Sequence, residues 1–124
     1  GNTVSESTES ITSILKAQPQ IKYVLCTGQA DTEGAGNAIG LNFAGQGYQA
    51  AGFDLSPAIL QNIIEGHLAF TIDQQPYIQG FYPVMQLTLL LRYGIVPSDM
   101  DTGAALITKD NAKSVLELSK LHYR

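Results

Sequence analysis

The chain has 124 residues, of which 44% are hydrophobic and 15% are charged, and its formal net charge at pH 7 is −4. This length and composition are typical of one globular domain with a substantial core. The sequence has no cluster of Lys and Arg, which argues against a nucleic-acid partner, because phosphate contacts need cationic side chains. No stretch approaches the roughly 18 continuous apolar residues of a membrane-spanning helix.

Helices and strands alternate along the sequence. Apolar residues at helical spacing predict a first helix that ends before Pro19, and a β-rich apolar run follows it. Ser56 followed by Pro57 is a strong helix start, because serine caps the first turn and proline fits its first position. Gly66 suits the end of that helix. The predicted order is a helix up to residue 18, strand 21–26, helix 32–44, strand 48–53, helix 57–65, strand 68–72, helix 77–93, strand 104–108 and helix 110–121.

The order αβαβαβαβα predicts an α/β fold: a parallel sheet with helices on both faces, joined by right-handed crossovers. Three glycines, Gly34, Gly36 and Gly40, predict that the second helix lies close against the sheet, at some cost in helix propensity. Pro83 lies inside the predicted long helix and predicts a kink or a restart there.

Polar side chains follow two of the predicted strands at the point where each strand ends. Asp54 follows Gly52-Phe53, and Gln74 follows Thr71-Ile72-Asp73. The carboxyl ends of parallel strands line the ligand crevice of an open α/β sheet. A carboxylate accepts hydrogen bonds from two neighbouring hydroxyls, and an amide both donates and accepts. The sequence therefore predicts a site for a hydroxyl-rich small molecule, with Asp54 and Gln74 side by side.

Each of these residues also has a structural interpretation. Asp54 is a candidate cap for the helix at Pro57, and Gln74 is a candidate solvated loop residue. For Asp73 we expect a hydrogen bond within the hinge, or a cap at the start of a helix, in preference to a contact with the ligand. Tyr77 is a candidate aromatic surface for a sugar ring, with packing of its helix as the alternative.

The sequence motifs give little support to a role in catalysis, metal binding or nucleotide binding. The run 34–40 misses the dinucleotide-binding glycine spacing, because Ile39 takes the third glycine position. Cys26 lies in an apolar run, and no pair of His and Cys residues has metal-ligand spacing, so we expect no cofactor and no metal. A carboxylate pair of Asp54 and Asp73, as in glycosidases, is the remaining enzymatic hypothesis and ranks below binding.

Five motifs follow one another along the chain: Gly52-Phe53-Asp54, Gln74-Gln75-Pro76-Tyr77-Ile78-Gln79-Gly80, Val96-Pro97, Asp101-Thr102-Gly103 and Ile107-Thr108-Lys109-Asp110-Asn111. They occur in the order found in periplasmic sugar-binding proteins of ABC transporters, in the ribose-binding-like group. The chain resembles the C-terminal part of these proteins, a type I periplasmic-binding-protein fold in which each half of a clamshell is flavodoxin-like. The resemblance implies that Asp54 and Gln74 bind sugar hydroxyls. A third family position, commonly asparagine, falls near Gly28, where Gln29 or Asp31 would substitute.

The resemblance divides the chain into three segments. Residues 1–74 correspond to most of the C-terminal lobe, 75–101 to a hinge crossing and a helix of the other lobe, and 102–124 to a returning strand and the terminal helix. The chain then corresponds to a fragment that lacks the other lobe. Apolar residues of the helix 77–93 would be left exposed, so we expect that helix to repack on the sheet or to self-associate with another copy.

The implied function is the solute-binding component of an ABC transport system, with a sugar or polyol as ligand and no bond broken. The implied partner of the full-length protein is an ABC permease. The implied location is periplasmic, or extracytoplasmic with a lipid anchor in a Gram-positive organism. The alternative is a ligand-sensing domain of a lacI-type regulator or a chemosensory protein. The repressors' effector domains lack the continuation seen at 74–80, which favours transport.

Overall fold

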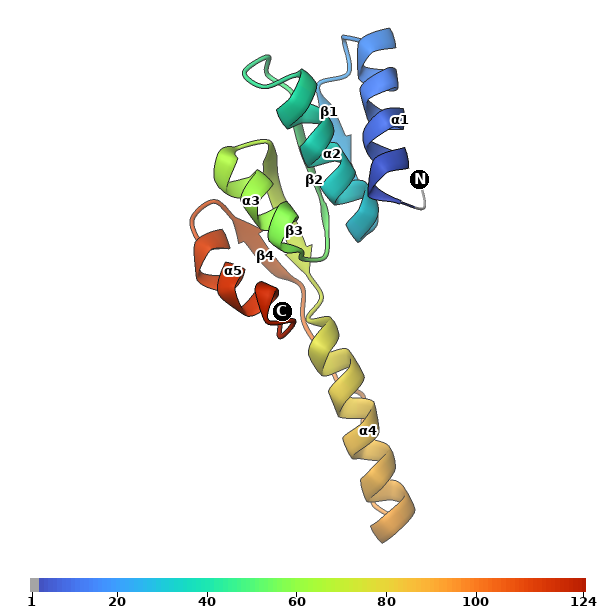
Figure 1. Ribbon diagram of the computed structural model, residues 1–124. Helices are drawn as coiled ribbons and strands as arrows, with labels where there is room; N and C mark the ends of the chain where they lie inside the picture. Colours follow the sequence, from blue (N-terminus) through green and yellow to red (C-terminus); the bar gives the residue numbers. More distant parts are fainter. Residues whose placement is uncertain (1–2) are drawn as a thin grey trace.

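The computed structural model describes residues 3–124, which form an α/β body from which one long helix projects (Figure 1). Every predicted helix and strand is present, and the predicted αβαβαβαβα order is confirmed. The bounds are α1 (Val4–Ala17), β1 (Tyr23–Leu25), α2 (Gln29–Asn42), β2 (Gln49–Phe53), α3 (Pro57–Glu65), β3 (Leu68–Asp73), α4 (Pro76–Tyr93), β4 (Ala105–Thr108) and α5 (Ala112–Lys120).

Local side-chain chemistry sets the helix ends in the body. Thr3 and Glu6 form a capping box at the start of α1, in which each side chain accepts the other residue's backbone N–H. At the start of α3 the Ser56 hydroxyl accepts the Ile59 N–H at 3.1 Å. Gly66 ends α3 in the left-handed conformation, with φ at 87°. The predicted start and end of this helix are confirmed.

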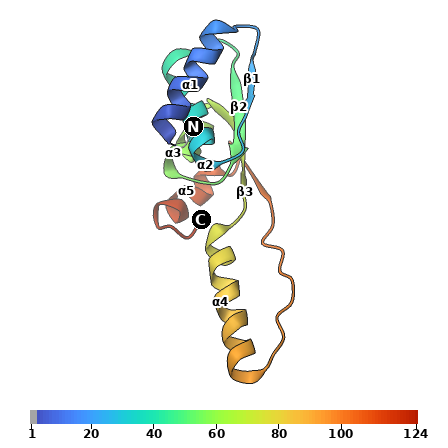
Figure 2. The same cartoon turned by 90° about the vertical axis from the view of Figure 1, so that its right-hand side faces the viewer.

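The four strands lie in the order β1-β2-β3-β4. β1, β2 and β3 are parallel, as predicted, whereas β4 pairs antiparallel to β3, so the prediction of an all-parallel sheet is wrong for this strand. After β3 the chain runs outward along α4, and residues 95–104 return beside that helix (Figure 2). β4 therefore enters the sheet at the edge from which β3 leaves, and it must run in the opposite direction.

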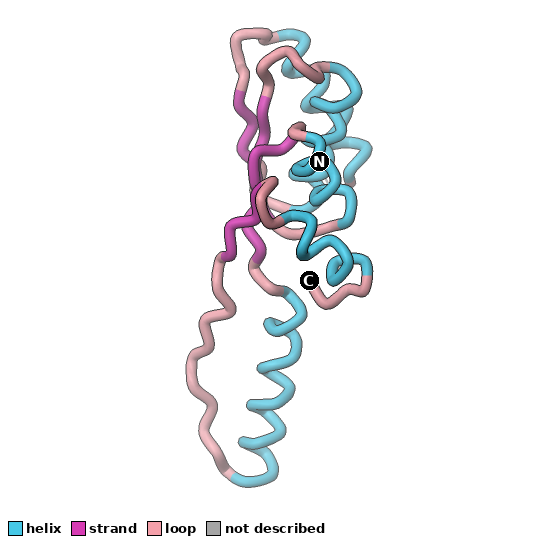
Figure 3. The backbone as a smooth tube through the Cα atoms, turned by 90° about the vertical axis from the view of Figure 1, so that its left-hand side faces the viewer, coloured by secondary structure: helices cyan, strands magenta, loops and turns pink. Residues whose placement is uncertain are grey.

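Helices α1, α2, α3 and α5 cover the same face of the sheet (Figure 3), so the prediction of helices on both faces does not hold for the described residues. The strand order advances in one direction from β1 to β3, so the two right-handed crossovers place α2 and α3 on the same side. The uncovered face is open to solvent at β1, where Tyr23 and Leu25 are 75% and 81% exposed.

The hydrophobic core lies between the helices and the sheet. Ile59, Leu60 and Ile63 of α3 are at its centre and are 0% exposed. Leu15 of α1 and Ile39 of α2 are part of the same buried cluster, together with residues of α5. The body therefore has a continuous core of its own.

The glycines of α2 face neighbouring helices. A Cβ added at Gly34 would lie 2.6 Å from the Ser7 Cβ of α1, and one added at Gly36 would lie 2.7 Å from the Asn62 side chain of α3. Gly34 and Gly36 thus allow α2 to lie close to α1 and α3, whereas the sequence predicts that these glycines face the sheet. The glycine that allows a close approach between α2 and the sheet is Gly52 of β2, where an added Cβ would collide with the Thr32 side chain.

Helix α4 projects beyond the end of the sheet (Figure 1). It is one continuous helix that contains Pro83, so the prediction of a restart at this proline is wrong. All 18 of its residues are described, and none of them is buried. The prediction that this helix repacks on the sheet is also wrong, because the helix continues outward from the end of β3 and cannot reach the sheet's face.

Candidate functional site

The candidate site lies at the carboxyl ends of β2 and β3. These strands are parallel neighbours, and Phe53 pairs with Ile72, so the residues that follow them emerge together. The Gln74 Nε2 atom donates a hydrogen bond to the Asp54 Oδ1 atom at 2.7 Å. Both side chains are half-buried. The prediction that Asp54 and Gln74 lie side by side is confirmed.

The backbone holds Asp54 in a conformation that is uncommon for a residue with a side chain. Its φ is 69°, in the left-handed region, and such conformations cost about 1–3 kcal/mol when they persist. The Asp54 N–H donates to the Ile72 carbonyl at 2.8 Å, and the Thr71 hydroxyl donates to the Asp54 carbonyl at 2.7 Å. Ser56 caps α3, so the capping interpretation of Asp54 is wrong.

Gln29 and Asp31 both lie on the first turn of α2 but face different neighbours. The Gln29 Nε2 atom donates to the Leu55 carbonyl at 3.3 Å, which places it beside the loop that follows Asp54. The Asp31 Oδ1 atom instead accepts the Ser7 hydroxyl of α1 at 2.8 Å. This hydrogen bond is the main cause that lowers the pKa of Asp31 below its ordinary value of 3.8. The structure thus brings Gln29 toward the Asp54 loop and binds Asp31 to α1.

Tyr77 lies on the first turn of α4 and is 50% exposed. Its ring packs edge-to-face against Tyr123, with ring centroids 5.6 Å apart. Its packing partner is therefore the segment that follows α5, while half of the residue's surface stays open to solvent.

Asp73 is fully buried at the end of β3, and the sequence correctly predicts a role in the hinge. Its Oδ1 atom accepts the Gln75 N–H at 2.8 Å, and its Oδ2 atom accepts the Arg124 Nε–H at 2.9 Å. Sequence reasoning missed Arg124. The only available signal was indirect, because a carboxylate expected inside the hinge needs a cationic partner.

Hydrogen bonds join the two chain segments that cross between the sheet and α4. The Gln75 Nε2 atom donates to the Thr102 carbonyl at 2.8 Å, and the Thr102 hydroxyl donates to the Gln74 carbonyl at 3.1 Å. The Gln79 Nε2 atom donates to the same Gln74 carbonyl at 2.8 Å. The backbone around Gln74 is thus fixed from the returning segment as well as from β3.

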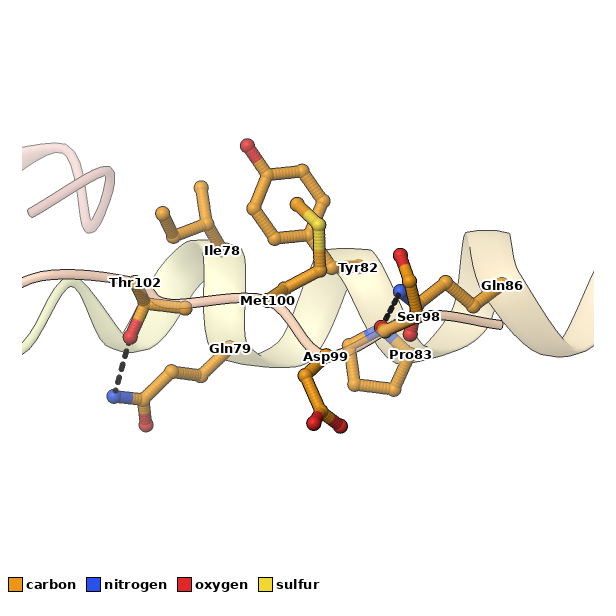
Figure 4. Close-up of a pocket in the computed structure, with 9 residues that line it drawn as sticks. All are labelled: Ile78, Gln79, Tyr82, Pro83, Gln86, Ser98, Asp99, Met100 and Thr102. Atoms are coloured by element: carbon orange, nitrogen blue, oxygen red, sulfur yellow. Dashed lines mark hydrogen bonds between the residues drawn. The ribbon is translucent and has the colours of Figure 1, made fainter. Parts of the chain in front are cut away.

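A cavity of about 320 Å³ lies farther out, between α4 and the returning segment (Figure 4). Ile78, Tyr82 and Met100 line it, and the Gln86 Nε2 atom bridges its far end to the Ser98 carbonyl at 2.8 Å. This cavity lies between the helix and the returning segment 95–104, and Asp54 and Gln74 are not among its lining residues.

Cys26 and Asp73, two candidates for a catalytic role, have other surroundings in the structure. Burial raises the pKa of the Cys26 thiol to about 11, so it is not a nucleophile near neutral pH. The Asp73 carboxylate accepts hydrogen bonds from Arg124 and from the Gln75 N–H. Within residues 3–124, no group of three or more His, Cys, Asp and Glu residues is placed to hold a metal ion. In the same range, no helix combines the length and apolar character needed to cross a membrane.

Comparisons with known proteins agree on one family. Residues 1–94 match the family described as periplasmic binding protein domain. The chain is 37% identical to the xylose/arabinose-binding protein XylF of Sulfolobus acidocaldarius, over 97% of this chain and 32% of XylF. It spans about a third of the length of this relative.

Two solved structures with bound sugars or polyols are similar along the whole chain. A carbohydrate transporter from Acidothermus cellulolyticus 11B, in complex with myo-inositol, is 28% identical with a TM-score of 0.83, over 100% of this chain and 44% of that one. A carbohydrate transporter solute binding protein from Agrobacterium radiobacter, in complex with D-arabinose, is 26% identical with a TM-score of 0.81, over 100% of this chain and 41% of that one.

Proposed function

The chain belongs to the periplasmic binding protein domain family, and on that premise we propose that it forms one wall of a sugar- or polyol-binding site in the solute-binding component of an ABC transport system. The observation that carries this proposal is the hydrogen-bonded pair of Asp54 and Gln74 at the ends of adjacent parallel strands. The ligands named for the relatives, which are pentoses and myo-inositol, support the same class of solute.

The pair suits a polyol because part of its hydrogen-bonding capacity is unused. Within residues 3–124, the Asp54 Oδ2 atom and the Gln74 Oε1 atom have no hydrogen-bond partner. Two neighbouring hydroxyl groups can donate to these two acceptors while the Asp54–Gln74 bond keeps both side chains in place. Hydrogen bonds to an ionised carboxylate are about twice as strong as neutral ones, so Asp54 is the stronger contact.

Neighbouring side chains extend the proposed site. Gln29 is the better candidate for a third polar contact, because it already reaches the loop after Asp54, whereas the Asp31 carboxylate is bound to Ser7. Tyr77 offers an exposed ring that can pack against the apolar face of a sugar.

We also propose that residues 75–101 belong with a second lobe that forms the opposite wall of the site, and that residues 1–74 and 102–124 form the lobe described here. The support is the absence of any buried residue along the fully described α4. In the 124-residue chain alone, a second copy is the proposed cover for this helix. The proposal includes a periplasmic location, or an extracytoplasmic one with a lipid anchor in a Gram-positive organism, and an ABC permease as partner of the full-length protein. The family supports a location outside the cytoplasm.

The test is titration calorimetry of the protein in the form its gene encodes, with D-arabinose, D-xylose and myo-inositol. We expect saturable binding of at least one of them. Asp54→Asn should weaken it about tenfold or more, because it removes the charge while asparagine tolerates the left-handed conformation. Asp110→Asn, at an exposed position after β4, is the matched control and should leave the affinity unchanged. Equal affinity of the Asp54 and Asp110 variants would refute the assignment.

A binding role also predicts that the protein does not hydrolyse sugar derivatives. Aryl glycosides should be stable in its presence, because Asp73 cannot act as a partner carboxylate to Asp54. Turnover that Asp54→Asn abolishes would replace the binding proposal with a hydrolytic one.

A further inference from the structure

The segment that follows α5 turns back onto the hinge crossing. The Tyr123 N–H donates to the Leu118 carbonyl at 3.0 Å and the His122 N–H to the Ser119 carbonyl at 3.0 Å, the double closure of a Schellman turn. His122 has a φ of 60°, the left-handed conformation that this turn requires. The reversal brings Tyr123 against Tyr77 on α4 and brings Arg124 against Asp73 on β3.

Arg124 neutralises a carboxylate that has no access to water. The Asp73 side chain is 0% exposed, whereas the Arg124 side chain is 28% exposed. Both the Nε and Nη2 atoms of Arg124 donate to the Asp73 Oδ2 atom. A buried carboxylate whose cationic partner is removed must take up a proton, admit water or move, because an unpaired buried charge is strongly unfavourable.

Asp73 in turn fixes the backbone on both sides of Gln74. Its Oδ1 atom accepts the Gln75 N–H at 2.8 Å and closes a turn around Gln74. Gln75 has a φ of 55°, so this turn holds a strained residue at the entry to α4. Gln74 lies between Asp73 and Gln75 in this turn, and from there its side chain donates a hydrogen bond to Asp54.

The strained positions gather at this edge. Among the described residues, the non-glycine residues with positive φ are Asp54, Gln75 and His122. They belong to the loop after β2, the crossing after β3 and the turn after α5, which are far apart in sequence. Strain of this kind persists only where surrounding contacts hold it, and it is concentrated at functional sites.

We propose that Arg124 is a positioning residue of the ligand site: through Asp73 it sets the turn that aims Gln74 at Asp54. This inference rests on the proposed sugar-binding function. Arg124 does not itself contact the ligand in this arrangement, and its effect on affinity passes through the Asp73 carboxylate.

The test compares Arg124→Gln with Arg92→Gln, which removes a positive charge from an exposed position of α4. Titration calorimetry with D-arabinose and myo-inositol should show affinity about tenfold weaker for Arg124→Gln, a typical size for a coupling through packed neighbours. Arg92→Gln should bind as the parent does. The double variant Asp73→Asn with Arg124→Gln removes both charges of the ion pair and should recover part of the lost affinity, which a general loss of stability would not allow.

Hydrogen exchange decides the positioning role even if none of these sugars binds. The Gln75 amide should exchange about tenfold faster in Arg124→Gln, because its hydrogen bond to a charged acceptor is weakened, and it should keep the parent rate in Arg92→Gln. An unchanged Gln75 rate, or an unchanged affinity in a protein that does bind sugar, overturns the role of Arg124. If the parent protein binds none of these sugars but Gln75 exchanges faster in Arg124→Gln, the proposed sugar-binding function is wrong. The role of Arg124 in holding the turn around Gln74 would then still stand.

Discussion

The α/β body and the projecting helix α4 differ in how much of their apolar side-chain surface is buried. Both are rich in apolar residues, but in the body Leu60 and Ile63 are 0% exposed, whereas on α4 Phe81 is 49% and Leu91 is 83% exposed. The body buries its apolar surface against its own sheet. Helix α4 is joined to the body by hydrogen bonds at its base and buries none of its residues. The difference supports the proposal that α4 packs against a second lobe or a second copy, because its apolar side chains have no cover among the described residues.

The largest effect that tests this difference in burial is expected from a matched pair of leucine-to-alanine substitutions. Leu60→Ala in the core of the body should lower the free energy of unfolding by about 2–5 kcal/mol. Leu91→Ala on α4 should change it by less than about 0.5 kcal/mol, because its side chain is already in solvent. Urea unfolding of the 124-residue chain measures both. Equal losses would mean that α4 packs as tightly as the core.

A pair of glycine substitutions gives the next largest effect. Gly34→Ala should destabilise the body by about 1–3 kcal/mol, since its Cβ would lie 3.0 Å from the Thr8 backbone nitrogen and 2.6 Å from the Ser7 Cβ. Gly80→Ala on α4 meets no atom within 4 Å and should stabilise the helix by up to about 1 kcal/mol. Thermal unfolding followed by circular dichroism distinguishes the two signs. Destabilisation by both variants would contradict the open surroundings of α4.

A smaller effect, with a pH signature, lies at the joint between α1 and α2. Ser7→Ala removes the hydrogen bond that lowers the pKa of Asp31 and should cost about 1–2 kcal/mol at pH 7. A depressed carboxyl pKa gives stability that is present above the ordinary value of 3.8 and is lost as the pH falls through the folded-state pKa.

The deficit of Ser7→Ala should therefore shrink below pH 3.8, which urea unfolding at several pH values measures. Ser10→Ala, at an exposed position of the same helix, is the control. A deficit that does not vary between pH 7 and pH 3 would show that the loss comes from packing alone.

The smallest expected effect tests the base of α4. Thr102→Val keeps the shape of the side chain but removes the hydrogen bond that the hydroxyl donates to the Gln74 carbonyl and the one that it accepts from the Gln79 Nε2 atom, and should cost about 0.5–1.5 kcal/mol. Thr88→Val removes a hydroxyl that bonds only to the Val84 carbonyl of its own helix and should cost less. Hydrogen exchange of the amides at 74–79 should increase for the first variant and not for the second. The opposite ranking would show that the crossing is not fixed by Thr102.

Local sequence signals predict the parts of this fold that depend on local chemistry. Ser56-Pro57 and Gly66 predict both ends of α3, and the apolar runs predict the strands, because capping and periodicity act within a few residues. The adjacency of Asp54 and Gln74 is also predictable, since consecutive parallel strands end at the same edge.

The remaining features depend on contacts between distant parts of the chain. The antiparallel direction of β4 follows from the path of α4 and residues 95–104, which no local pattern encodes. The side of the sheet taken by the helices follows from strand order, and strand order is a tertiary property. Arg124 reaches Asp73 across 51 residues, and Asp31 turns to Ser7 instead of the ligand edge. These four differences lie where tertiary geometry decides between options that are equally compatible with the local sequence.

The most direct test of the central claim is a crystal structure of the protein in complex with D-arabinose or myo-inositol. The account predicts two ring hydroxyls within hydrogen-bonding distance, about 2.5–3.2 Å, of Asp54 and Gln74. A bound sugar that leaves both side chains without contact to it would contradict the assignment of this edge as the site.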